Sequence, residues 1–150
     1  MKQSINKYLG YFLIFLMAMM LIDVLWGVFT RYALGNQASW TEELARFLLI
    51  WISILGAAYA SGQKMHLSID LLRPRLTEKG RERLSVFINF MIIFFAIAVL
   101  LVGGGRLIYI TNVLEQLSPA LRLPMSLVYS VLPISGLLII YYKMTDLRRT

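Results

Sequence analysis

One carboxylic acid lies inside a segment of this chain that is otherwise apolar enough to cross a bilayer. Asp23 stands about seven residues, or roughly 10 Å of helix, before the end of the stretch at residues 8–30. A carboxylate at such a depth costs several kcal/mol unless it is paired or protonated. Arg46 enters the next apolar stretch to a comparable depth, so we predict a structural Asp23–Arg46 ion pair between two helices. An acid near the wetter interface and a proton or ion relay remain alternatives.

The other residues that could do chemistry form no catalytic set. His66 and Asp70 are four positions apart and share a helix face, but no nucleophile or third metal ligand stands at a useful spacing. The chain has no cysteine. No HExxH, serine–lysine or paired-aspartate arrangement occurs in the apolar stretches. We therefore expect a protein that is not an enzyme and that carries no cofactor or metal of its own.

Four apolar stretches position these residues. They run over residues 8–30, 44–62, 84–105 and 124–142, each near the ~20 residues that a tilted helix needs to span a bilayer. Hydrophobic residues make up 59% of the chain and charged residues 15%. The sequence predicts one all-α integral membrane domain over residues 1–150, with four transmembrane helices.

The basic residues indicate the orientation of these helices. Most of the 15 Lys and Arg residues lie before the first stretch, between the second and third, or after the fourth. The exceptions near the other two connections are Arg31, Arg46, Arg106 and Arg122. The positive-inside rule then places both termini in the cytosol. The net charge of +7 favours anionic phospholipid headgroups as partners, and we expect no nucleic-acid binding.

The segment between the first two stretches carries a helix-start signal. Ser39-Trp40-Thr41-Glu42 fits a capping box, in which the Ser39 hydroxyl would bond the amide of Glu42. Glu42 and Glu43 precede Arg46 by four and three residues, so either can pair with it on one helix face. The second helix is therefore predicted to begin near Ser39.

The two remaining connections differ in character. Residues 63–83 alternate apolar and basic side chains, which predicts an interfacial amphipathic arm that contains His66 and Asp70 and turns Arg73 and Arg75 toward phosphates. After Gly105 the third helix is expected to continue beyond the membrane into an extended connection. There Ser118-Pro119 predicts a new helix start, and farther on Pro133 predicts a kink in the fourth helix.

These residues together resemble one known family. The motifs that carry the likeness are Arg31-Tyr32, the run Ser39-Trp40-Thr41-Glu42-Glu43-Leu44-Ala45-Arg46, Gly56-Ala57-Ala58, His66 and Asp70. Within four spans, they are similar to the DctQ family, the small membrane subunit of tripartite ATP-independent periplasmic (TRAP) transporters. The likeness covers nearly the whole chain, and the segment from Trp40 to Arg46 is its most specific part.

The resemblance implies a role and partners. It implies a bacterial inner-membrane scaffold for a large membrane subunit, which would hold the sodium and substrate sites. It also implies a periplasmic binding protein that delivers an organic acid, commonly a C4-dicarboxylate or a sialic acid. Residues of the two outer connections would be in reach of that protein: Trp40, Glu42, Glu43, Glu115 and Arg122. The alternative is a stand-alone four-helix exporter that couples protons through Asp23.

Overall fold

The computed structural model describes residues 2–35, 38–63 and 78–147. Its helices are α1 (Lys2–Ala33), α2 (Ser39–Gly62), α4 (Glu78–Phe95), the π-helix η2 (Ala96–Gly103), α5 (Gly104–Val113), α6 (Met125–Tyr129) and α7 (Val131–Leu147). Four helical stretches, Ser4–Ala33, Ser39–Gly62, Arg83–Val113 and Met125–Asp146, are long and apolar enough to cross a membrane, which confirms the four predicted spans. The predictions for His66, Asp70, Arg73 and Arg75 lie outside the described residues.

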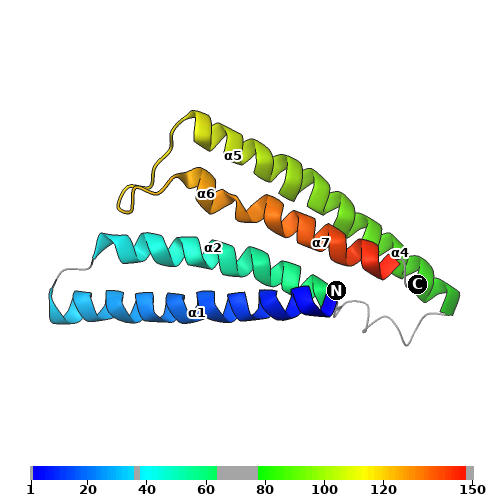
Figure 1. Ribbon diagram of the computed structural model, residues 1–150, viewed down its shortest axis with the longest axis horizontal. Helices are drawn as coiled ribbons and strands as arrows, with labels where there is room; N and C mark the ends of the chain where they lie inside the picture. The colour runs from blue at the N-terminus through cyan, green and yellow to red at the C-terminus, as the bar shows by residue number, and fades with distance from the viewer. Residues whose placement is uncertain (1, 36–37, 64–77, 148–150) are drawn as a thin grey trace.

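The spans lie side by side in a row rather than in a closed bundle (Figure 1). Within the described part of the chain, α1 packs extensively against α2 alone, α2 packs against α7, and α7 packs against the third span, formed by α4, η2 and α5. Large apolar side chains therefore remain exposed along α1 and the third span. Such surfaces suit lipid or a membrane partner, because a soluble monomer rarely exposes them.

Two small cores hold the row together. Leucines at positions 9, 13 and 16 of α1 meet Leu48 and Leu55 of α2 and Val131 of α7. Ala58 of α2 meets Ala96 and Leu100 of η2 and Ile139 of α7. The middle helices α2 and α7 contribute to both cores, so they form the centre of the row.

Both ends of the described chain lie at the same end of the long helices, on the right in Figure 1, as an even number of spans requires. We call this the terminal end. The opposite end, which holds the α1–α2 and α5–α6 connections, is called the distal end. The first connection turns through Gly35, whose φ of 69° is a conformation that glycine adopts without strain.

The contact between the third span and α7 is very close. A Cβ atom added to Gly104 would lie 2.7 Å from Cβ of Leu132, and one added to Gly136 would lie 3.0 Å from Cβ of Leu100. Small residues allow this approach between membrane helices. Gly104 thus has the close-packing role that a glycine-rich span end favours.

The fourth span is interrupted next to Pro133, as the sequence predicts. Helix α6 ends at Tyr129 and α7 begins at Val131, and the hydroxyl of Ser130 donates to the carbonyl of Leu127 at 2.6 Å. Proline lacks the amide that would continue the hydrogen-bond pattern. At the same level, the indole Nε1–H of Trp51 donates to the carbonyl of Val128 at 3.1 Å and ties α2 to α6.

Candidate functional site

Asp23 occupies a core position in the seam between α1 and α2. The α1 residues on this side follow at steps of three and four: Leu9, Leu13, Leu16, Met20, Asp23, Gly27 and Thr30. Apolar side chains are the rule in a seam with this spacing. Asp23 is only 5% exposed, and neither of its carboxylate oxygens has a hydrogen-bond partner. A buried polar group without a partner is destabilising, so this position calls for a functional explanation.

The predicted Asp23–Arg46 ion pair is not formed in this structure. The Arg46 guanidinium instead lies 3.7 Å from the carboxylate of Glu42, one turn earlier on α2, and the two side chains are 74% and 57% exposed. Thr41 and Leu48, which are seven residues apart, are the buried α2 residues here. Arg46 falls outside that stripe and points away from the seam. Asp23 and Arg46 lie at comparable depths in their helices, but depth does not determine the direction in which a side chain points around its helix axis.

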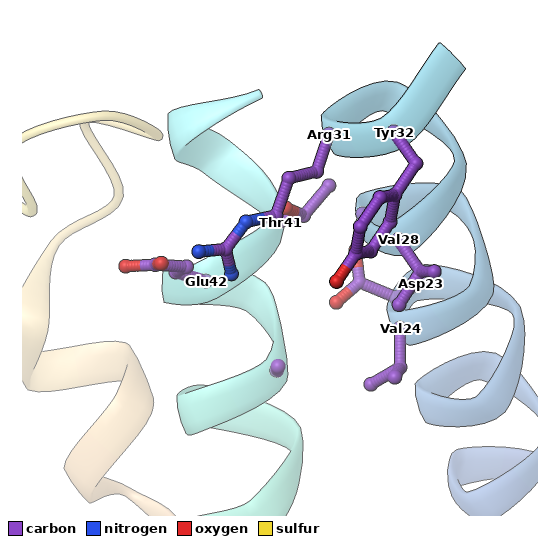
Figure 2. Close-up of a pocket in the computed structure, with 9 residues that line it drawn as sticks. Asp23, Val24, Val28, Arg31, Tyr32, Thr41 and Glu42 are labelled. Carbon is purple, nitrogen blue, oxygen red and sulfur yellow. The ribbon is translucent and has the colours of Figure 1, made fainter. Parts of the chain in front are cut away.

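A hollow of about 300 Å³ adjoins Asp23 at the distal end of the seam. Val24, Val28 and Arg31 line it from α1, and Thr41, Glu42 and Ala45 line it from α2. Figure 2 shows Asp23 pointing from α1 into the space between the two helices. The lining combines two acids, Asp23 and Glu42, with one base, Arg31, and is otherwise largely apolar.

The helix start at Ser39 is confirmed, but the predicted capping box is wrong. Ala38 occupies the N-cap position, and no side chain caps the helix. The hydroxyl of Thr41 donates to the carbonyl of Ala38 at 2.8 Å. Thr41 is buried against α1, where its hydroxyl oxygen would lie 3.1 Å from a Cβ at Gly27. Packing at the seam therefore determines the local geometry of this helix start.

Glu43 fastens the second distal connection to α2. Its Oε1 accepts the amide N–H of Ala120 at 3.0 Å, and its Oε2 accepts that of Leu121 at 2.9 Å. The sequence analysis missed this contact and placed a new helix at Ser118-Pro119, where the structure has a turn instead. The sequence held one signal for this contact. A short turn after Pro119 leaves the backbone amides of Ala120 and Leu121 without hydrogen-bond partners inside the turn, so an acceptor from elsewhere is needed.

The connection itself is a hairpin. The amide of Ser118 donates to the carbonyl of Leu123 at 2.9 Å, and the amide of Met125 donates to that of Gln116 at 2.9 Å. The amide of Leu123 also donates to the hydroxyl of Ser118 at 3.2 Å. We call residues 114–124 the distal hairpin.

The five predicted binding-protein contacts are all placed at the distal end. Trp40, Glu42, Glu115 and Arg122 are exposed there. Glu43 differs, because both of its carboxylate oxygens are engaged by the distal hairpin. The set thus contains four surface residues and one residue that organises the surface.

The described residues offer little for catalysis. In residues 2–35, 38–63 and 78–147, no group of three or more His, Cys, Asp or Glu side chains could hold a metal ion. The buried acids Asp23 and Asp146 lie on different spans, α1 and α7, and the buried Asn89 belongs to α4. The hollow at the distal end and the acid that lines it, Asp23, are suited to binding another surface.

Comparison with known proteins gives a consistent family. The model of the "Tripartite ATP-independent periplasmic transporters, DctQ component" family matches residues 19–150. A putative TRAP transporter small permease protein of Haemophilus influenzae is 32% identical over 146 residues, which cover 97% of this chain and 89% of that protein. The sialic acid TRAP transporter small permease protein SiaQ of Vibrio cholerae is 28% identical over 69% of this chain and 60% of its own length.

A third relative is much longer than this chain. The isethionate TRAP transporter permease protein DctMQ of Oleidesulfovibrio alaskensis is 35% identical over 98 residues. These residues cover 65% of this chain but only 15% of that protein. The matching segment is therefore a small part of a larger permease polypeptide in that relative.

Proposed function

The chain belongs to the DctQ family of tripartite ATP-independent periplasmic (TRAP) transporter components, and from this membership we propose that it is the small scaffold subunit of a sodium-driven importer. It is a subunit of a membrane transporter and not an enzyme. Small subunits of this family work with a large permease subunit and with a periplasmic binding protein, and these are its proposed partners.

The observation that carries the scaffold role is the open row of spans. A transporter that acts alone normally builds a polar site near the bilayer midplane, often from broken helices. In the described part of this chain, the buried charged side chains within the spans are Asp23 in the distal half of α1 and Lys143 and Asp146 near the terminal end of α7. Near the middle of the fourth span, the buried hydroxyl of Ser135 donates to the carbonyl of Leu132 at 2.8 Å. Exposed apolar side chains along α1 would be available for a large membrane partner, and those along the third span for lipid.

The proposed site of action is the bacterial inner membrane, with both termini in the cytosol. The excess of Lys and Arg in the segments on the terminal side supports this orientation. The distal end would then face the periplasm, where Trp40, Glu42, Glu115 and Arg122 are exposed in reach of a binding protein.

The proposed cargo is an organic acid of the dicarboxylate or sialic acid class. The names of matched relatives include sialic acid and C4-dicarboxylate, which support this class, and also isethionate and ectoine, which lie outside it. This chain would hold neither the cargo nor the sodium ion, and both sites would lie in the large subunit.

Reconstitution tests the proposal. Liposomes that contain this chain alone, the large permease alone, or both are supplied with the binding protein and a radiolabelled organic acid under an inward sodium gradient. We expect uptake only when both membrane proteins are present. Uptake or proton-coupled efflux by this chain alone would contradict the scaffold role. Sodium-independent uptake by the complete system would contradict the sodium driving force.

A further inference from the structure

The hollow beside Asp23 continues into a second, apolar hollow on the same side of the α1–α2 pair. This second hollow measures about 730 Å³ and is lined by Met17, Leu21 and Val24 of α1 and by Leu49 and Ile52 of α2, among others. Val24 lines both hollows, so the two form one groove with a polar distal end. We call this combined surface the α1–α2 groove.

The spacing of the lining residues fits a third helix. On α2, Glu42, Ala45, Leu49 and Ile52 follow at steps of three, four and three. On α1, Met17, Val24 and Arg31 follow at steps of seven. Two helices that present such stripes side by side accept the side chains of another helix in the groove between them.

Gly56 extends the α2 stripe by one further step of four residues. A Cβ atom added to Gly56 would have no neighbour within 4 Å. Close packing therefore gives no reason for a glycine here within the described chain. An absent side chain at this position allows another helix backbone to approach closely.

The chemistry of the groove specifies what the helix must carry. Asp23 is buried without a hydrogen-bond partner, and Glu42 and Arg31 line the same hollow. Glu42 already has a base beside it, because its carboxylate lies 3.7 Å from the Arg46 guanidinium. Asp23 is therefore the acid of this hollow that still calls for a partner. In a bilayer no bulk water reaches this depth to satisfy the acid, so a cationic or N–H or O–H donor side chain complements it.

We propose that the α1–α2 groove is the docking surface for a transmembrane helix of the large permease subunit, and that a donor side chain of that helix binds the Asp23 carboxyl group. The inference rests on the proposed function, which supplies this partner. The DctMQ relative, where the matching segment forms 15% of a longer permease, shows that the two parts can share one polypeptide.

Site-specific photo-crosslinking tests the position of the interface. The chain is expressed with the large permease, and p-benzoylphenylalanine replaces either Leu21 or Ile22. These neighbours are 61% and 67% exposed and lie about 100° apart around α1, but only Leu21 lines the groove. We expect a crosslink to the large permease from position 21, and about fivefold less from position 22. Equal yields, or a product at position 21 that contains only lipid or a second copy of this chain, would overturn the proposal.

A pair of glycine variants tests the same surface by obstruction. Gly56→Leu fills the groove, and Gly105→Leu adds the same side chain on the third span, where nothing lies within 4 Å either. We expect Gly56→Leu to reduce co-purification of the large permease about tenfold and Gly105→Leu to leave it unchanged. Equal behaviour of the two variants would refute the groove. Failure of the unmodified chain to co-purify with the large permease would instead refute the proposed function.

Discussion

The third span meets α7 through Gly104 and Gly136, whereas α1 meets α2 through a seam that contains a buried acid without a partner. In the first contact, a Cβ on Gly104 would be only 2.7 Å from a neighbouring Cβ. In the second, a hollow of about 300 Å³ adjoins Asp23. The first seam is complete within the described chain, and the second leaves polar groups and space for another molecule. A stable contact and a contact kept available for a partner thus occur on opposite sides of the same row.

Overfilling the complete seam gives the largest expected effect. Gly104→Leu forces side-chain atoms into Leu132 and Pro133. Overpacking costs about 1–3 kcal/mol and occasionally more, and this close contact belongs at the upper end of that range. We expect a large fall in the melting temperature of the purified protein in detergent. Gly105→Leu is the matched control and should melt as the unmodified protein does; an equal fall in both variants would show that the seam is not specifically close-packed.

Removing the acid from the incomplete seam gives the next largest effect, with the opposite sign. Asp23→Leu replaces an unsatisfied polar group by an apolar one, so the isolated chain should gain roughly 1–3 kcal/mol of stability. The same variant should lose affinity for the large permease. Thermal melting and co-purification measure the two effects separately. A less stable isolated chain would mean that Asp23 has a stabilising partner within it.

Glu43 connects the two sides of the row at the distal end, and its removal should act locally. Glu43→Ala deletes both acceptors of the Ala120 and Leu121 amides. We expect hydrogen exchange in the distal hairpin to rise about tenfold while exchange in α7 is unchanged. Glu42→Ala is the control, because the Glu42 carboxylate lies beside Arg46, whereas the hairpin amides bond to Glu43, and the two acids share one helix turn. Unchanged exchange in the distal hairpin would argue against a stabilising role for the two hydrogen bonds to Glu43.

The smallest effect is expected at Arg46. Its contact with Glu42 is mostly exposed, and pairs of this kind contribute about 0.3–0.5 kcal/mol. Arg46→Ala should therefore shift the melting temperature of the isolated chain by no more than about 1–2 °C. A fall in melting temperature as large as that of Gly104→Leu would instead support the Asp23–Arg46 ion pair that the sequence predicts.

The four spans and the break in the fourth were predictable because apolar length and the proline at position 133 act locally along the chain. Apolar length determines which segments can cross a bilayer, and a missing amide interrupts a helix regardless of its neighbours. The break between α6 and α7 next to Pro133 agrees with this. The helix start at Ser39 was predicted at the right residue, but from a capping box that does not form.

The errors concern contacts between elements. The Asp23–Arg46 pair required the rotation of α2 about its axis, which depends on the packing of Thr41 and Leu48 against α1. The capping box failed because Ala38, and not Ser39, occupies the N-cap position of the helix that packs there. The hydrogen bonds of Glu43 join it to Ala120 and Leu121, nearly eighty positions away in the sequence. Sequence spacing within one helix carries no direct information about the contacts of Asp23 and Glu43 with other helices.

The most direct measurement of the central claim is a structure of this chain in complex with the large permease in a lipid nanodisc. A helix of the large permease should lie in the α1–α2 groove next to Gly56, with one of its nitrogen or oxygen donors within hydrogen-bond distance of the Asp23 carboxyl group. A groove that contains only lipid, with the large permease bound to another face of the row, would contradict the claim.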